Sequence, residues 1–181
     1  METSYYKPEL FSKCAEFHGH VCPGLSIGYR AALYAMKLLD LKFSEDEDVV
    51  CVTENDACGV DAIQVLLGCS AGKGNLIFHI RGKQAFNFYN RKTGESVRLI
   101  LKPEFNGRGG SREERMDQLH SLKDEEIFDV KPVTFRLPEE ARIFNSFVCE
   151  KCGEVVAESF LRIENGKKIC LDCFSEYTRF C

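Results

Sequence analysis

Four cysteines in the last third of the chain are spaced like the ligands of one metal ion. They form two Cys-x-x-Cys pairs, Cys149 with Cys152 and Cys170 with Cys173, and 17 residues separate the pairs. This spacing is typical of structural zinc sites, in which four thiolates complete a tetrahedron and leave no open position. An iron–sulfur cluster or a pair of redox dithiols uses the same residues and remains an alternative. We interpret the four cysteines as a structural zinc site.

The sequence between and after the pairs predicts a small zinc-dependent fold. Asn165-Gly166 is a strong two-residue hairpin turn, with Val155 to Ile163 before it and Lys168-Ile169 after it. After Cys170, apolar side chains recur at helical spacing and predict a short helix; they are Leu171, Phe174 and Tyr177. A knuckle, a hairpin and a helix opened by cysteine describe a treble-clef or zinc-ribbon module. A piece this small cannot bury enough apolar surface alone, so the metal must supply folding energy.

The charge of this module does not predict nucleic-acid binding. From Cys149 to Cys181 there are five Lys or Arg and six Asp or Glu, and the whole chain has a formal net charge of −4. Nucleic-acid-binding domains usually present a basic footprint. We therefore expect no nucleic-acid partner and favour docking to a protein.

A second set of metal-capable side chains lies near the start of the chain. His18, His20 and Cys22 fall within five residues, in a segment that leads through Pro23-Gly24 into a predicted helix. Cys22 is expected at or next to the helix N-cap, where unpaired amides and the helix dipole stabilise a thiolate. The two histidines face the same way only if the backbone between them is extended. We interpret the segment as a metal or catalytic site; the alternative is a pair of histidines capping a helix, with Cys22 packed inside.

A polar turn after a predicted buried strand carries further candidates. The strand Val49–Thr53 is followed by Glu54-Asn55-Asp56-Ala57-Cys58, and Cys58 again precedes a helix. Asp56 is either a polar partner in a site or a cap of that helix. Lys73, between two glycines, either offers an ammonium to an anion or is a solvated turn residue.

These two segments together predict a cleft in which Cys22 and Cys58 face one another. The candidate ligands of a second metal are His18, His20, Cys22 and Cys58. The candidate catalytic residues are Cys22, Cys58, His20, Asp56 and Lys73, with Asp61 nearby. Mixed imidazole and thiolate ligands favour zinc, nickel, copper or iron over magnesium or calcium. The alternatives are a zinc-finger adaptor with a dimerising core and a thiol redox protein that uses Cys22 and Cys58 as a pair.

The helices and strands expected around these residues indicate an α+β core with a mixed or antiparallel sheet. We expect helices over 9–17, 23–40, 60–67 and 111–121, with a further short helix near 123. We expect strands over 49–53, 76–80, 85–90, 96–101 and 130–137. The helix over 23–40 is predicted to be largely buried by its apolar residues, which are Leu25, Ile27, Ala31, Ala32, Ala35, Leu38 and Leu39. Pro138-Glu139-Glu140 marks the boundary between a core domain, 1–138, and a zinc finger, 139–181.

The remaining composition indicates a cytoplasmic protein. The chain has 181 residues and ten cysteines, with no run of about 20 apolar residues, and its first six residues lack the pattern of a signal peptide. Without an export signal, these cysteines favour metal or thiol chemistry over disulfides. Asn106 to Gly110 is predicted to be a flexible loop. Four cysteines lack a polar context and are expected to serve as small apolar side chains; they are Cys14, Cys51, Cys69 and Cys181.

The histidine–cysteine segment near the start of the chain resembles the opening motif of the FmdE family, which is named for formylmethanofuran dehydrogenase. The resemblance runs from His18 to Leu25 and continues at Gly28 and Arg30. The Asp61-Ala62-Ile63-Gln64 segment with its preceding acidic residue and cysteine is similar to the family's second motif. The paired cysteines resemble the zinc finger that many members carry. The resemblance implies an α+β core, a C-terminal finger and a homodimer. It also implies association with operons for molybdenum or tungsten formylmethanofuran dehydrogenase, whose subunits are candidate partners.

Overall fold

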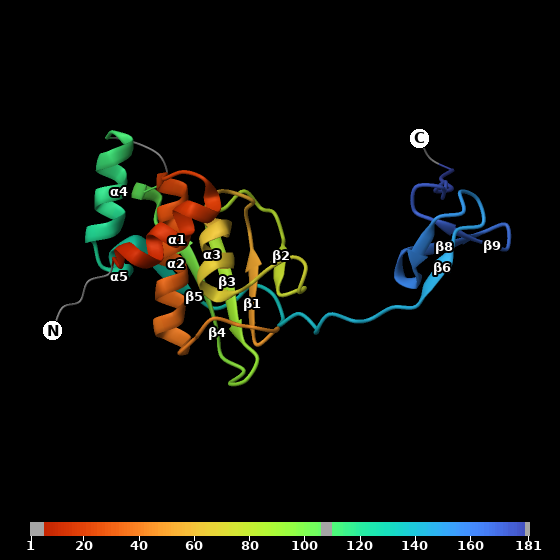
Figure 1. Ribbon diagram of the computed structural model, residues 1–181, viewed down its shortest axis with the longest axis horizontal. Helices are drawn as coiled ribbons and strands as arrows, with labels where there is room; N and C mark the ends of the chain where they lie inside the picture. The colour runs from red at the N-terminus through yellow and green to blue at the C-terminus, as the bar shows by residue number, and fades with distance from the viewer. Residues whose placement is uncertain (1–5, 106–109, 180–181) are drawn as a thin grey trace. The chain divides into compact units, whose positions relative to one another are not determined.

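The chain forms two compact units, Met1–Ala141 and Arg142–Cys181, in the computed structural model shown in Figure 1. The structure describes residues 6–105 and 110–179. Cys181 and most of the predicted loop from Asn106 to Gly110 lie outside the described residues. Within the described ranges, no helix is both long and apolar enough to span a membrane.

The first unit is built on a five-stranded mixed sheet, which confirms the predicted α+β class. The strands lie in the order β2-β1-β3-β4-β5, with β2 parallel to β1 and every other neighbouring pair antiparallel. Their bounds are β1 Val49–Thr53, β2 Leu76–Phe78, β3 Ala85–Asn90, β4 Ser96–Leu101 and β5 Phe128–Lys131. Because β1 and β2 are parallel, their carboxyl ends share one edge of the sheet.

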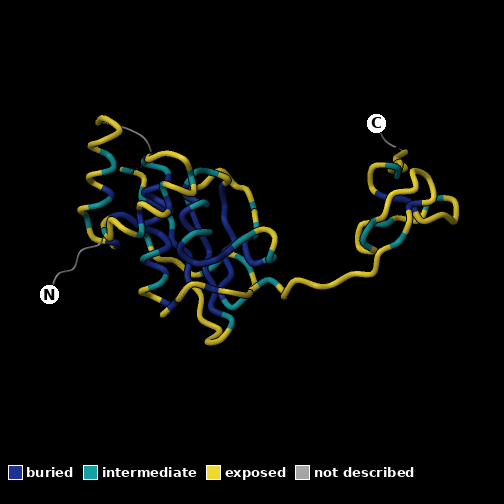
Figure 2. Tube along the Cα trace, in the orientation of Figure 1, coloured by how far each residue is buried: buried dark blue, intermediate teal, exposed yellow. Residues whose placement is uncertain are grey.

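Helices cover one side of this sheet, and the buried core lies between the two layers (Figures 1 and 2). The helices are α1 Pro8–His18, α2 Pro23–Leu39, α3 Gly59–Leu67, α4 Arg112–Ser121 and α5 Asp124–Ile127, with a 3₁₀ turn at Pro103–Phe105. Cys14, Cys51 and Cys69 are fully buried, as predicted. The prediction that Leu38 is buried is wrong, because it is 40% exposed. Leu38 and Leu39 point about 100° apart around the helix, and Leu39 takes the core-facing position.

The last strand of the sheet is shorter than predicted. β5 ends at Lys131, and Pro132 follows. Proline has no N–H to donate to a strand ladder, so the pairing stops there. The chain continues across the second face of the sheet, where Val133 and Phe135 pack against Val50, Val52 and Tyr89.

Two glycines bring α2 and α3 into backbone contact. A methyl group on Gly28 would overlap the carbonyl group of Gly59, and one on Gly59 would lie 2.9 Å from the amide nitrogen of Gly28. No other residue type fits this crossing without moving a helix. The close approach matters for function because Cys22 is the N-cap of α2 and Cys58 is the N-cap of α3.

Two buried ion pairs were not predicted from the sequence. Glu54, which is 2% exposed, accepts two hydrogen bonds from Arg98 at 2.6 and 3.0 Å and one from Asn87. The hydrogen bond from Arg98 lowers the pKa of the Glu54 carboxyl. Arg30 is fully buried and donates to the Asp124 carboxylate at 2.7 Å, which joins α2 to α5.

The second unit contains two antiparallel strand pairs. β6 Ser146–Val148 pairs with β7 Val155–Ala157, and β8 Leu161–Glu164 pairs with β9 Lys167–Cys170. Asn165 and Gly166 both have positive φ, 51° and 79°, as the predicted hairpin turn requires. The predicted hairpin strand was too long, because Val155 pairs with Val148 and only Leu161–Glu164 enters the hairpin.

Candidate metal centres

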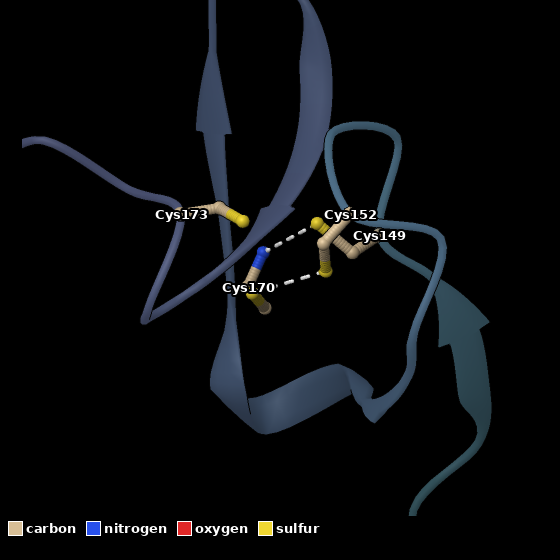
Figure 3. Close-up of side chains that lie close together, drawn as sticks. All are labelled: Cys149, Cys152, Cys170 and Cys173. Carbon is tan, nitrogen blue, oxygen red and sulfur yellow. Dashed lines mark hydrogen bonds between the residues drawn. The ribbon is translucent and has the colours of Figure 1, made fainter.

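The four finger cysteines converge on one point (Figure 3). Their sulfur atoms all lie within 4.8 Å of one another, and the Cys152 and Cys170 sulfurs are 3.9 Å apart. Four thiolates at about 2.3 Å from a tetrahedral zinc ion are about 3.8 Å from one another. The spacing and the donor set therefore fit zinc.

Two tight turns of similar design hold these sulfurs. The amide of Gly153 donates to the carbonyl of Cys149, and the amides of Cys173 and Phe174 donate to the carbonyl of Cys170. The predicted helix after Cys170 is wrong, because residues 171–173 form a turn and no helix follows up to residue 179. The second cysteine pair therefore lies on a knuckle like the first, which matches the zinc-ribbon form of the prediction.

The pKa values of these thiols depend on how close the four cysteines lie to one another. Backbone hydrogen bonds, first from Cys152 and then from Cys170, lower the pKa of Cys149 to about 6. A hydrogen bond with Cys170, together with burial, raises the pKa of Cys173 to about 12. Four sulfurs this close cannot all ionise unless a metal ion balances their charge.

The second cluster lies where α1 ends and α2 begins. Ligand atoms of His18, His20 and Cys22 all lie within 4.8 Å of one another. The His18 Nε2 atom is 3.9 Å from the Cys22 sulfur, and the ring centroids of His18 and His20 are 4.4 Å apart. Cys22 is buried, whereas His20 is exposed, so the cluster opens to solvent on one side.

The backbone between the two histidines differs from the prediction. His18 is the last residue of α1, and Gly19 is its C-cap in the left-handed conformation, with φ of 85°. The two rings were expected to face the same way only if this segment were extended, but the turn brings them together. Glycine permits it because it has no Cβ to clash at positive φ.

Cys58 approaches Cys22 at the crossing of α2 and α3. Gly24 leaves a space that both thiols border, since a methyl group there would lie 3.6 Å from the Cys58 sulfur and 3.8 Å from the Cys22 sulfur. Burial raises the pKa of the Cys58 thiol, and hydrogen bonding and charge repulsion with Cys22 raise it further. Cys58 is outside the group of three whose ligand atoms are mutually within 4.8 Å. It therefore flanks the cluster beside Cys22.

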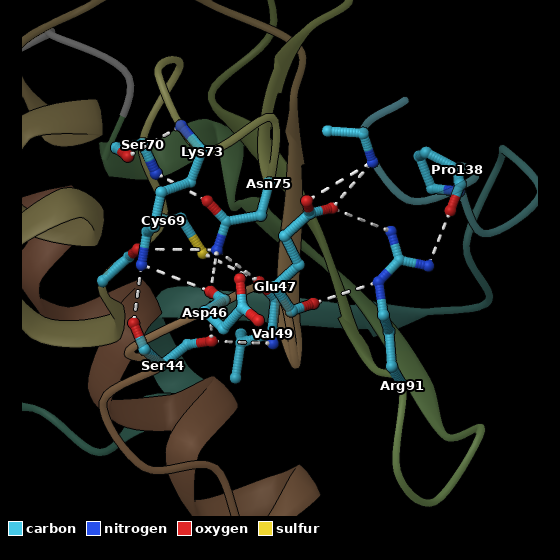
Figure 4. A network of polar contacts seen from close by, with 12 residues as sticks. Ser44, Asp46, Glu47, Val49, Cys69, Ser70, Lys73, Asn75, Arg91 and Pro138 are labelled. Atoms are coloured by element: carbon cyan, nitrogen blue, oxygen red, sulfur yellow. Dashed lines mark hydrogen bonds and ion pairs between the residues drawn. The ribbon is translucent and has the colours of Figure 1, made fainter. Parts of the chain in front are cut away.

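Asp56 and Lys73, the other two predicted site residues, are not among the three residues whose ligand atoms converge. Asp56 is exposed on the turn between β1 and α3, and the N-cap of α3 is Cys58, without a side-chain cap. Lys73 donates its ammonium protons to the carbonyl oxygens of Ser44, Glu45 and Asp46 at 2.7, 3.3 and 3.2 Å (Figure 4).

Lys73 is separated from Cys58 by the length of α3. The amide of Ser44 bonds to the carbonyl of Leu67, at the C-terminal end of that helix. Cys58 is at its N-terminal end, and nine residues of helix span about 13 Å. The structure therefore does not bring Lys73 to the histidine–cysteine cluster.

Asp61, which was expected near the site without an assigned role, contacts His18 directly. Its Oδ2 atom lies 2.7 Å from the Nδ1 atom of His18, and its Oδ1 atom accepts a hydrogen bond from Gln64 at 3.0 Å. Asp61 follows Cys58 by three residues, which places both on one face of α3. That spacing is a signal that Asp61 lies beside Cys58, but not that it contacts His18.

Comparisons with known proteins match both units. Residues 17–133 match the model of the family described as "FmdE, Molybdenum formylmethanofuran dehydrogenase operon". Residues 142–179 match the family described as "Prokaryotic dksA/traR C4-type zinc finger". The second match agrees with the predicted zinc finger, and with the four-cysteine cluster it indicates a structural zinc.

Two individual proteins are similar over most of the chain. A protein of Archaeoglobus fulgidus named "Probable S-adenosyl-L-methionine-binding protein" is 32% identical over 93% of this chain, which spans about half the length of that protein. The crystal structure of a "tungsten formylmethanofuran dehydrogenase subunit e (fmde)-like protein" from Syntrophus aciditrophicus superposes with a TM-score of 0.64. It is 24% identical, and the match covers 91% of this chain and 89% of that one. At that identity, this second likeness shows the fold alone.

Proposed function

This chain belongs to the FmdE family, and we propose that its core binds a transition metal ion at the cluster of His18, His20 and Cys22. The observation that carries the proposal is that ligand atoms of all three residues lie within 4.8 Å of one another. Two imidazoles and a thiolate suit zinc, nickel, copper or iron. Cys58, beside Cys22, supplies a fourth ligand after a small shift or remains as a free thiol.

The openness of the cluster favours a reactive or exchangeable metal over a purely structural one. His20 is exposed, so one side of the site is accessible to a small molecule. A three-ligand site with a free position is the arrangement of catalytic zinc, whereas structural zinc has four protein ligands. A bound metal there supplies Lewis-acid chemistry, and the same openness suits delivery of a metal to a molybdenum or tungsten enzyme.

Metal content of the full chain tests the proposal. We expect two metal ions per chain, one in the finger and one in the core. Cys22→Ser should lower the content to one. Cys69→Ser is the matched control, because Cys69 is buried, donates to the Val49 carbonyl and is remote in sequence from both clusters. One metal ion per wild-type chain, lost on Cys170→Ser, would contradict a core metal site.

A thiol redox pair is the first rival, and a chelator separates it from a metal site. Metal should protect Cys22 and Cys58 from alkylation, and removal of the metal should expose them. A redox pair should instead lose reactivity on oxidation and regain it with a dithiol, whatever the metal content. The second rival, an adaptor with a structural core, predicts neither response.

Binding of S-adenosylmethionine is a second candidate function. It is favoured by the 32% identity to the Archaeoglobus fulgidus protein that bears this ligand in its name. Calorimetric titration of the full chain with S-adenosylmethionine, with and without metal, tests it. No heat of binding in either state would remove this candidate and leave the metal proposal untouched.

A further inference from the structure

We infer that Asp61 is a positioning residue that fixes the tautomer of His18 and so selects Nε2 as its ligand nitrogen. The inference deepens the proposed metal site and rests on it. Its evidence is a chain of contacts that runs from Gln64 through Asp61 to His18 and on to Cys22.

The contact between Asp61 and His18 determines where the imidazole proton lies. A neutral imidazole has one N–H donor and one acceptor nitrogen, and an ionised carboxylate only accepts. With Asp61 Oδ2 at 2.7 Å from Nδ1, the proton belongs on Nδ1. The lone pair is then on Nε2, the atom that faces the Cys22 sulfur at 3.9 Å. Carboxylates hold metal-bound histidines in this way in many proteins.

Asp61 is itself fixed on both oxygens. Oδ2 contacts His18, and Oδ1 accepts from the Gln64 side chain one helical turn along α3. The carboxylate also lies in the first turn of α3, where the helix dipole favours a negative charge. A carboxylate held in this way keeps its geometry while the exposed side of the cluster exchanges ligands.

The hydrogen bond to Asp61 attaches the end of α1 to α3. His18 is the last residue of α1, and Gly19 follows it in the left-handed conformation. Its ring is mostly enclosed, with 12% of the side chain exposed, against 33% for Asp61. The hydrogen bond therefore spans 43 residues of sequence and ties the end of α1 to the helix that begins beside Cys58.

The first experiment reads the tautomer directly in the metal-free full chain. Nitrogen-15 NMR of labelled imidazoles should show His18 protonated on Nδ1, and Asp61→Asn should shift the population toward the Nε2 tautomer. Asp117→Asn is the matched control, because it makes the same chemical change at an exposed position on α4. A wild-type His18 protonated mainly on Nε2 would overturn the inference.

The second experiment reads the ligand role. The full chain, with zinc in its finger, is titrated with Co²⁺, and the visible bands of thiolate-bound cobalt are recorded. Asp61→Asn should weaken cobalt binding about 10- to 100-fold and alter the bands, and Asp61→Glu should recover part of the loss. Asp117→Asn should match the wild type. Equal affinity and spectra for Asp61→Asn and the wild type would overturn the inference alone. A wild-type chain that binds no second metal would overturn the proposed function, even if the NMR result stands.

Discussion

Replacing Gly28 with alanine should push α2 away from α3 and disturb the core metal cluster at the same time. The new methyl carbon would lie closer to the Gly59 carbonyl group than the 3.0 Å that real methyl carbons keep. Both partners at this contact are backbone, so no side chain can rotate out of the way. One helix must shift by about 1 Å.

The expected cost follows from two opposing effects. Overpacking a close-packed core costs about 1–3 kcal/mol, and a clash with backbone belongs at the upper end. Alanine is favoured over glycine inside a helix by about 1 kcal/mol, which offsets part of the loss. We expect a net loss of about 2 kcal/mol in the free energy of unfolding.

Urea unfolding followed by far-ultraviolet circular dichroism measures this change. With a slope of about 2 kcal/mol per molar urea, the midpoint should fall by about 1 M. Gly72→Ala is the matched control, because nothing lies within 4 Å of a methyl group at that position. Affinity for the second metal should fall in Gly28→Ala and remain unchanged in Gly72→Ala. Equal midpoints for the two variants would refute the claim that the Gly28–Gly59 contact sets the helix separation.

Three further predictions concern the finger, a half-buried histidine and assembly. Cys170→Ser should remove one zinc ion and unfold the second unit while the core stays folded; a zinc content equal to that of the wild type would contradict the finger assignment. Burial, followed by the charge of Arg30, lowers the pKa of His120 from 6.5 to about 4. The unfolded chain therefore binds a proton that the native chain does not, and stability should fall as the pH drops through this window. His120→Phe should flatten that part of the urea-midpoint profile, and a slope like that of the wild type would speak against it. Light scattering should give twice the 20.6 kDa mass of one chain for the proposed homodimer, and the single mass would refute it.

Much of the fold could be predicted because local sequence patterns determine where its strands and turns lie. The strands β3 and β4 have the predicted bounds, since alternating side chains and the turn between them determine both ends. Asn165-Gly166 determined a turn in the same way, because both positions need positive φ. The last strand of the sheet was predicted too long because the local signal of Pro132 was not used: the proline ends β5, and the chain after it packs on the second face of the sheet.

The candidate site was predicted in its ligand types and less well in its partners. Spacing alone identified both clusters, since metal ligands close in sequence need only a tight turn to converge. Lys73 shows the limit, because a lysine between glycines looks the same whether it meets an anion or three carbonyl groups of a loop 27 to 29 residues away. Asp61 meets His18 only after α1 and α3 have packed, and no pattern within either segment contains that distance.

Topology then explains why a metal at this cluster should stabilise the core. Cys22 begins α2 and His18 ends α1, while Asp61 lies on α3, which crosses between the parallel strands β1 and β2. A metal ion held by Cys22 and His18, with His18 anchored by Asp61, links α1, α2 and α3. In the unfolded chain these three helices are not held together. A ligand that binds only the native state stabilises it by about 2.7 kcal/mol at 100 times its dissociation constant. The midpoint of core unfolding should therefore rise with metal concentration in the wild type. It should rise less in Asp61→Asn, because the weaker site is less saturated. If the unfolding midpoint of the core did not change with metal concentration while that of the finger rose, all bound metal would be in the finger.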